Sequence, residues 1–172
     1  IENEQFGEYR MLLSAWAQVD PLQALDYAKE KTGTNFARQT ILSAWAKNDT
    51  EGAVAWARDN FDSEAKGADA NPWLIGVIQG ISSTDLGRAT QLLEELPFSR
   101  GRGQALDAVF AEVTASGPDN AKRWIASLTD DKLKSGAAGR LAGQLAREDP
   151  RSAAEWAFSM GEDILKSPAG EI

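Results

Sequence analysis

A motif that recurs five times is the feature that most constrains how this chain can fold. Each copy is centred on an anchor position, and the anchors follow one another at intervals of about 32 residues. An alanine stands four residues after every anchor, and large side chains stand four residues before it and seven after it. A repeat with this period and pattern predicts helical hairpins that stack on one another. The anchors are Asp20, Asp49, Asp85, Gly117 and Asp149.

Each copy predicts a first helix before the anchor, a tight turn at the anchor and a second helix after it. In the first copy, Leu12 and Trp16 stand at the i, i+4 spacing of one helical face. Asp20-Pro21 then ends the first helix, because proline cannot continue a helix but suits the first turn of a new one. The Asp20 side chain supplies an oxygen that caps the second helix. The other aspartate anchors predict the same cap, and Gly117 a weaker version of the turn.

The sequence therefore predicts an all-α fold, a right-handed α-α superhelix (solenoid) of about five stacked antiparallel helical hairpins in one domain, 1–172. No run of alternating β-branched residues predicts a strand. The longest predicted loop is 62–72, the segment 97–103 is a second irregularity, and we expect the tail 162–172 to be frayed. The hairpins are expected at about 4–31, 34–61, 72–96, 102–128 and 133–161.

A run of small residues in the first helix of the fifth copy contains Gly136, Gly139 and Gly143. Glycine inside a helix costs up to about 1 kcal/mol relative to alanine. We therefore expect a compensating gain, in which this helix packs closely against its neighbours.

The repeated unit L-S-A-W-A-x2-D, with alanine four and an aromatic residue seven positions after the aspartate, resembles α-solenoid repeats of the tetratricopeptide and Sel1-like class. It lacks the W-x2-L-G-x2-Y order of the tetratricopeptide consensus. The Asp-Pro turn is similar to that of HEAT repeats, whose period is longer. The resemblance covers 4–161 and implies protein–protein interaction through an extended concave surface. The motif also looks like that of bacterial repeat proteins, for which both the cytoplasm and the periplasm remain open.

Composition disfavours several classes of function. The chain has 18 basic and 26 acidic residues, a net charge of −8, which disfavours nucleic-acid binding. The charge is explained by solubility, and the alternative is that the more acidic N-terminal half attracts a basic partner. It has no Cys and no His, so disulfides, thiolate nucleophiles and the usual zinc sites are excluded. No apolar run is long enough to insert into a membrane. Because the chain begins at Ile1, we expect a mature form or an excised piece, which leaves open the earlier removal of a targeting segment.

Three residues are candidates for contact with a partner. Trp73 occupies a column that holds Glu or Ala in the other copies, which favours partial exposure, although most tryptophans on repeat columns belong to a core. Arg100 and Arg102 stand beside glycines near a predicted helix start, where they could hold a phosphate or a carboxylate. A solvated loop is the alternative for this pair. Polar positions that the core pattern leaves free on the second helices are Lys29, Arg58, Glu94 and Ser159.

No residue set predicts catalysis, a metal site or a cofactor site. The anchor aspartates are better explained as helix caps than as paired glycosidase acids. The acidic stretch 59–69 lacks the ligand order of a calcium loop. Ser14 and Ser43 recur at one column of the repeat, but no base accompanies them.

We therefore expect a non-catalytic scaffold that binds a protein or peptide on its surface. Two alternatives remain open: a structural or regulatory module of a larger bacterial protein, and an enzyme or small-molecule binder built on a helical superhelix. Both terminal copies keep the motif, whereas the ends of a repeat array are ordinarily atypical. This favours either a piece of a longer array or a homodimer formed through the repeat ends.

Overall fold

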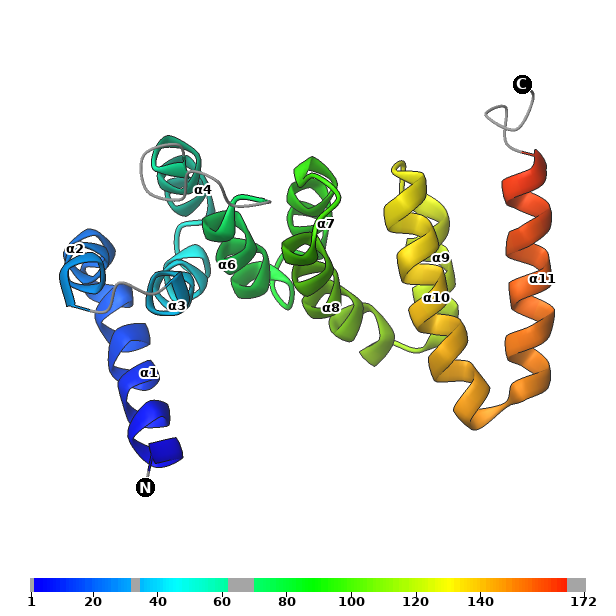
Figure 1. Ribbon diagram of the computed structural model, residues 1–172, viewed down its shortest axis with the longest axis horizontal. Coiled ribbons are helices and arrows are strands. Elements are labelled where there is room, and N and C mark those ends of the chain that lie inside the picture. The colour runs from blue at the N-terminus through cyan, green and yellow to red at the C-terminus, as the bar shows by residue number, and fades with distance from the viewer. Residues whose placement is uncertain (1, 32–34, 62–69, 167–172) are drawn as a thin grey trace. The chain divides into compact units, whose positions relative to one another are not determined.

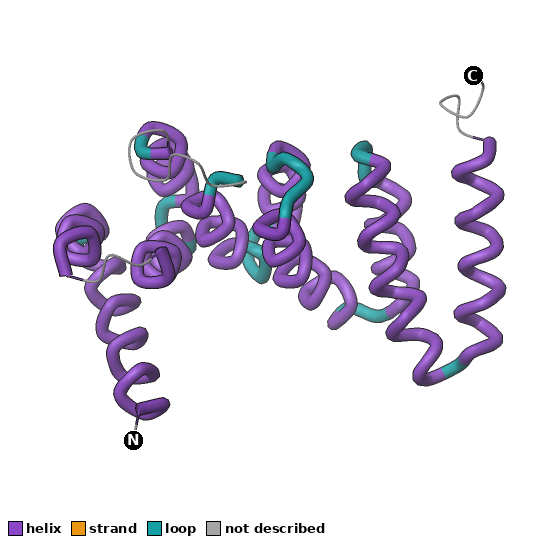
Figure 2. Tube along the Cα trace, in the orientation of Figure 1, coloured by secondary structure: helices purple, strands orange, loops and turns teal. Residues whose placement is uncertain are grey.

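The computed structural model describes residues 2–31, 35–61 and 70–166, and the regular structure in these ranges is entirely helical (Figures 1 and 2). This confirms the predicted all-α class. Most of the predicted loop 62–72 lies outside the described residues. The helices are α1 (Glu2–Val19), α2 (Pro21–Lys31), α3 (Asn35–Ala46), α4 (Thr50–Asp59), α6 (Pro72–Ile81), α7 (Leu86–Glu95), α8 (Arg100–Ala115), α9 (Pro118–Ser127), α10 (Asp131–Glu148) and α11 (Pro150–Lys166).

Two predicted boundaries differ from the structure. The segment 97–103 was expected to be irregular, but α8 begins at Arg100. The tail was expected to fray from residue 162, but α11 continues to Lys166. The remainder of that tail, 167–172, lies outside the described residues.

The anchors cap the helices that follow them, as predicted. In each copy with an aspartate anchor, a carboxylate oxygen accepts a hydrogen bond from the backbone N–H three residues later, at 2.9 to 3.2 Å. Gly117 has a φ of 97° and provides no side-chain cap, and Pro118 at the helix start has no backbone N–H that would need one. Asp130 also caps a helix, since its Oδ1 accepts a hydrogen bond from the Leu133 N–H at 2.7 Å. The start of each second helix is therefore encoded locally.

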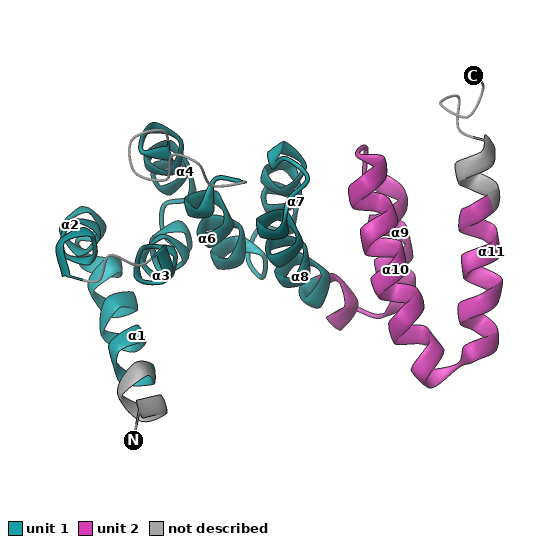
Figure 3. Ribbon diagram, viewed as in Figure 1, with its two compact units in different colours: residues 1–112 teal, residues 113–172 magenta. Residues whose placement is uncertain are grey.

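The chain divides into two compact units, residues 1–112 and 113–172, with the boundary inside α8 (Figure 3). In the first unit, the first helices of three successive copies pack in order, α1 against α3 and α3 against α6. The second helices α2, α4 and α7 each pack against the first helix of their own copy. In the second unit, α10 packs against both α9 and α11.

The repeat columns form the core of each unit. The alanine four residues after the anchor is 0% exposed in the first four copies and 6% exposed in the fifth. The apolar residue eight positions before the anchor is at most 1% exposed in four copies, but in the first copy this residue, Leu12, is 68% exposed. In the second and third copies, the first helix of the preceding copy packs against the helix that carries this residue, α1 against α3 and α3 against α6. No described helix takes that place for α1.

Two glycines let α6 approach α3 more closely than other residues would allow. A Cβ at Gly76 would lie 2.8 Å from the carbonyl oxygen of Gln39, and one at Gly80 would lie 2.8 Å from the Cα of Ser43. The close packing expected at Gly139 and Gly143 is wrong, because nothing among the described residues lies within 4 Å of their Cβ positions. The close approach at glycines therefore joins the second and third copies, and it is not found at Gly139 or Gly143 of the fifth.

Candidate functional site

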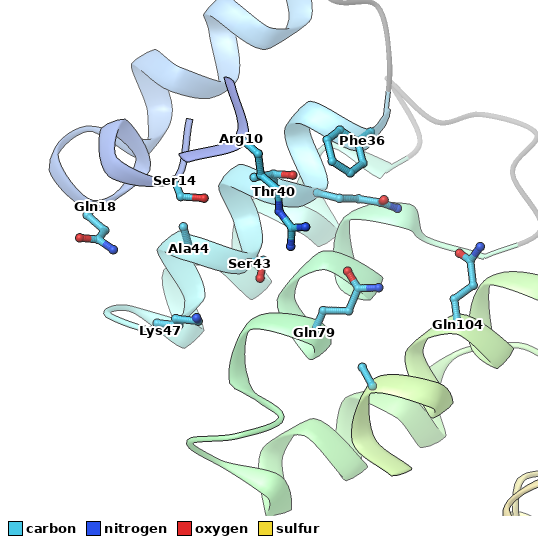
Figure 4. Close-up of a pocket in the computed structure, with 12 residues that line it drawn as sticks. Arg10, Ser14, Gln18, Phe36, Thr40, Ser43, Ala44, Lys47, Gln79 and Gln104 are labelled. Carbon is cyan, nitrogen blue, oxygen red and sulfur yellow. The ribbon is translucent and has the colours of Figure 1, made fainter. Parts of the chain in front are cut away.

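A groove of about 700 Å³ opens in the first unit, on the side formed by the first helices (Figure 4). Its walls come from α1, α3, α6 and α8. In the first two copies, six of the lining residues stand ten, six and two positions before the anchor, a spacing of four that places them on one face of a helix. The residues at these columns are Arg10, Ser14, Gln18, Gln39, Ser43, Lys47 and Gln79. Successive copies therefore contribute the same helix face to one surface.

The lining of the groove is polar and carries positive charge. Hydroxyl groups and primary amides make up most of it, and Arg10 and Lys47 supply two cations. None of the twelve residues that line the groove is an aspartate or a glutamate. The net charge of the groove lining is therefore positive, whereas the net charge of the whole chain is −8.

Several groups in the groove are available to a ligand. Within the part of the chain that the structure describes, Arg10, Lys47 and the side chain of Gln79 make no hydrogen bond and no ion pair. All three are exposed. Gln39 is positioned by a hydrogen bond from its Nε2 to the carbonyl oxygen of Pro72 at 3.1 Å, which leaves its Oε1 as an acceptor.

Trp73, a predicted contact residue, lies in the core of the first unit. Its side chain is 0% exposed, so the expected partial exposure is wrong. The Trp56 ring packs edge-on against it, with 6.1 Å between centroids, and the Arg38 guanidinium carbon lies 4.4 Å from the Trp73 ring centroid. Such aromatic and cation–π contacts stabilise a packed interior. We assign Trp73 a packing role.

Arg100 and Arg102 differ in exposure and in their contacts. Arg100 is exposed in the first turn of α8, whereas Arg102 is only 4% exposed. The Nε of Arg102 donates a hydrogen bond to the carbonyl oxygen of Leu93 at 3.3 Å, and its backbone N–H donates to Oγ of Ser99 at 3.1 Å. The solvated-loop alternative is therefore wrong for Arg102. Partner binding by Arg100 stays a prediction.

The polar residues proposed on the second helices are engaged within the protein. Arg58 forms an ion pair with Glu95 at 2.6 Å, and the hydroxyl of Ser159 donates a hydrogen bond to the carbonyl oxygen of Trp156 at 2.7 Å. Lys29 and Glu94 also have partners. Sequence reasoning thus looked to the second helices and missed the first-helix face. The recurrence of Ser14 and Ser43 at one column was the signal that could have identified it.

The described residues hold no group of three or more acidic, histidine or cysteine side chains that could bind a metal ion. Among the described helices, none combines the length and the apolar character that crossing a membrane requires. Comparison with known proteins finds no matching family model, no similar curated protein and no similar solved structure.

Proposed function

We propose that this protein is a non-catalytic scaffold that binds an extended peptide segment of another protein in the groove of its first unit. The observation that carries the proposal is the convergence of the same helix face from consecutive copies on one polar groove. Its volume of about 700 Å³ falls within the range of about 300–1,000 Å³ that is usual for ligand sites. The proposal includes the finer architecture, in which five hairpins stack as a right-handed solenoid and present their first helices to the partner.

Amide side chains suit the backbone of an extended peptide. Such a backbone presents N–H donors and C=O acceptors that are not paired with each other. A glutamine side chain offers both a donor and an acceptor, and Gln18, Gln79 and Gln104 line the groove from three different helices. These groups can pair with a peptide at several points along its length. This favours a peptide ligand over the structural-module and small-molecule alternatives.

The test uses a matched pair of glutamine substitutions in the first unit. Peptides that the purified chain selects from a displayed random library are labelled, and their affinities are measured by fluorescence anisotropy. Gln79→Trp fills the groove and should abolish binding. Gln23→Trp places the same bulk on the exposed face of α2, outside the groove, and should leave binding unchanged. Circular dichroism melts should show that both variants remain folded. If no peptide is selected, or if both variants bind alike, the proposal is wrong.

A further inference from the structure

We infer that the peptide held in this groove is acidic, with its carboxylates bound by Arg10 and Lys47. This inference rests on the proposed function and names the chemistry of its ligand. The two cations stand on different walls, Arg10 on α1 and Lys47 directly after α3. Figure 4 shows Arg10 reaching across α3 towards Ser43, while Gln79 approaches the same space from α6.

The groove lining contains no acidic residue, although acidic residues outnumber basic ones in the chain. The sequence has 26 acidic residues in 172, and 18 basic ones, so acidic side chains should reach most surfaces. The twelve lining residues nevertheless include two cations and no carboxylate. A basic ligand would meet like charge here and no counter-charge, so the basic partner expected from net charge does not fit this groove. An acidic ligand would meet opposite charge and no like charge.

Two other cations of the first unit are already paired with carboxylates. Arg58 is paired with Glu95, and Arg88 is held by both carboxylate oxygens of Glu51. Arg10 and Lys47 have no counter-ion within the described residues, as is also true of Lys31 and Arg100 outside the groove. The two groove cations differ from that second pair in being exposed beside hydroxyl and amide groups of the same lining. A guanidinium can bind a carboxylate through two parallel hydrogen bonds, and an ammonium adds a second point of charge. The groove therefore offers two carboxylate sites with polar groups between them.

Carboxylates can come from acidic side chains or from a peptide's C-terminus, and the observations favour side chains because two cations are available. The probes are labelled twelve-residue peptides of alternating Asp and Gly, or of alternating Asn and Gly, each with both ends blocked. A third probe is the Asn/Gly peptide with a free C-terminal carboxylate. We expect the Asp/Gly peptide to bind at least about tenfold more tightly than either neutral-side-chain peptide, as charge-assisted hydrogen bonds predict. Raising the salt concentration should weaken this binding.

Variants that each remove one positive charge test whether Arg10 and Lys47 bind the peptide's carboxylates. Arg10→Gln and Lys47→Gln should each reduce affinity for the Asp/Gly peptide about tenfold. Lys31→Gln removes the same charge from exposed α2, outside the groove, and should have no comparable effect. Melting curves of all three variants should match that of the parent chain, because none of these side chains is buried.

Four outcomes would overturn the inference. If library-selected neutral peptides bind the groove and acidic residues add nothing, the ligand class is wrong while the proposed function stands. If no peptide binds at all, both fail. Equal binding of the Asn/Gly peptide with a free C-terminus would assign the site to a terminal carboxylate instead of side chains. Tighter binding of a single-stranded oligonucleotide that is lost in Arg10→Gln would assign the site to phosphates.

Discussion

Gly80 of α6 lies against the backbone of Ser43 in α3, so closely that a Cβ at position 80 would stand 2.8 Å from the Ser43 Cα. The Ser43 side chain lines the groove, and Gln79, the neighbour of Gly80, lines it as well. The glycine contact therefore sets the spacing between two walls of the proposed binding site. Any side chain at position 80 would push these walls apart.

Replacing Gly80 with alanine should destabilise the protein by roughly 1–3 kcal/mol, because the added methyl group meets backbone that cannot move aside. Gly139→Ala is the matched control, since nothing lies within 4 Å of its Cβ position. That change should stabilise the protein by up to about 1 kcal/mol through helix propensity. Urea unfolding followed by circular dichroism measures both. A stabilising Gly80→Ala would disprove the close α3–α6 contact.

Truncation of the residue eight positions before the anchor should destabilise the protein in the second copy but not in the first. Ile41 and Leu12 stand at the same column, but Ile41 is 0% exposed and Leu12 is 68% exposed. Ile41→Ala removes fully buried methyl groups and should cost roughly 2–5 kcal/mol. Leu12→Ala should change the free energy of unfolding by less than about 0.5 kcal/mol. Similar losses for both would show that another part of the protein covers Leu12 in solution.

An ion pair between second helices should couple adjacent copies weakly. Arg88 of α7 donates from Nε and Nη2 to the two carboxylate oxygens of Glu51 in α4, at 2.8 and 2.9 Å. This hydrogen bonding, above all other effects, raises the pKa of Arg88. A double-mutant cycle with Glu51→Gln and Arg88→Gln should give a coupling of about 0.2–1 kcal/mol that falls with salt, as for exposed pairs. A coupling of zero at low salt would mean that the pair does not hold in solution.

The features predicted correctly from the sequence are those that depend on nearby residues. The anchor caps are hydrogen bonds between residues three positions apart, so the identity of the anchor and the spacing are sufficient to predict them. Burial of the alanine four residues after each anchor follows from the repeat itself, since every copy must bury the same face. Division of the chain into two units was not predicted, because it depends on contacts between copies.

Features that depend on a neighbouring helix were not predictable from composition or spacing. Gly76 and Gly80 have the same spacing of four as Gly139 and Gly143, but only the first pair has a helix against it. Trp73 stands in a column that holds Glu or Ala in the other copies, and this difference favoured an exposed side chain. In the structure, its ring packs against Trp56 instead, and Arg38 lies over it. The recurrence of Ser14 and Ser43 at one column was weighed only as a possible catalytic site, and the column by itself does not predict that α1, α3, α6 and α8 surround one groove.

The two arginines near the start of α8 should differ in their effect on stability. Arg102→Ala removes a buried side chain that donates to the carbonyl oxygen of Leu93, and should cost roughly 1–3 kcal/mol. Arg100→Ala changes an exposed residue and should cost less than about 0.5 kcal/mol. Thermal unfolding of both single variants measures the difference. Equal midpoints would show that the α8 start is not packed against α7.

The cap of α11 should lose its stabilising effect in acid. Oδ2 of Asp149 accepts a hydrogen bond from the hydroxyl of Ser152 at 2.6 Å, and Oδ1 accepts one from the Ser152 backbone N–H at 3.2 Å. These bonds favour the charged carboxylate and hold the pKa of Asp149 below its ordinary value of 3.8. A pKa that is lower in the folded state means that the stabilisation is present above pH 3.8 and is lost as the pH falls through the folded-state pKa.

Removing the hydroxyl donor tests this cause directly. Ser152→Ala should raise the pKa of Asp149 towards 3.8, because the hydroxyl hydrogen bond is the largest contribution to its lowering. Ser159→Ala on the same helix is the control, since that hydroxyl donates to the carbonyl oxygen of Trp156 and does not touch Asp149. A carboxyl-carbon NMR titration measures the pKa in each variant. An unchanged pKa in Ser152→Ala would leave the backbone N–H groups of Arg151 and Ser152 as the cause, because they alone would still stabilise the carboxylate.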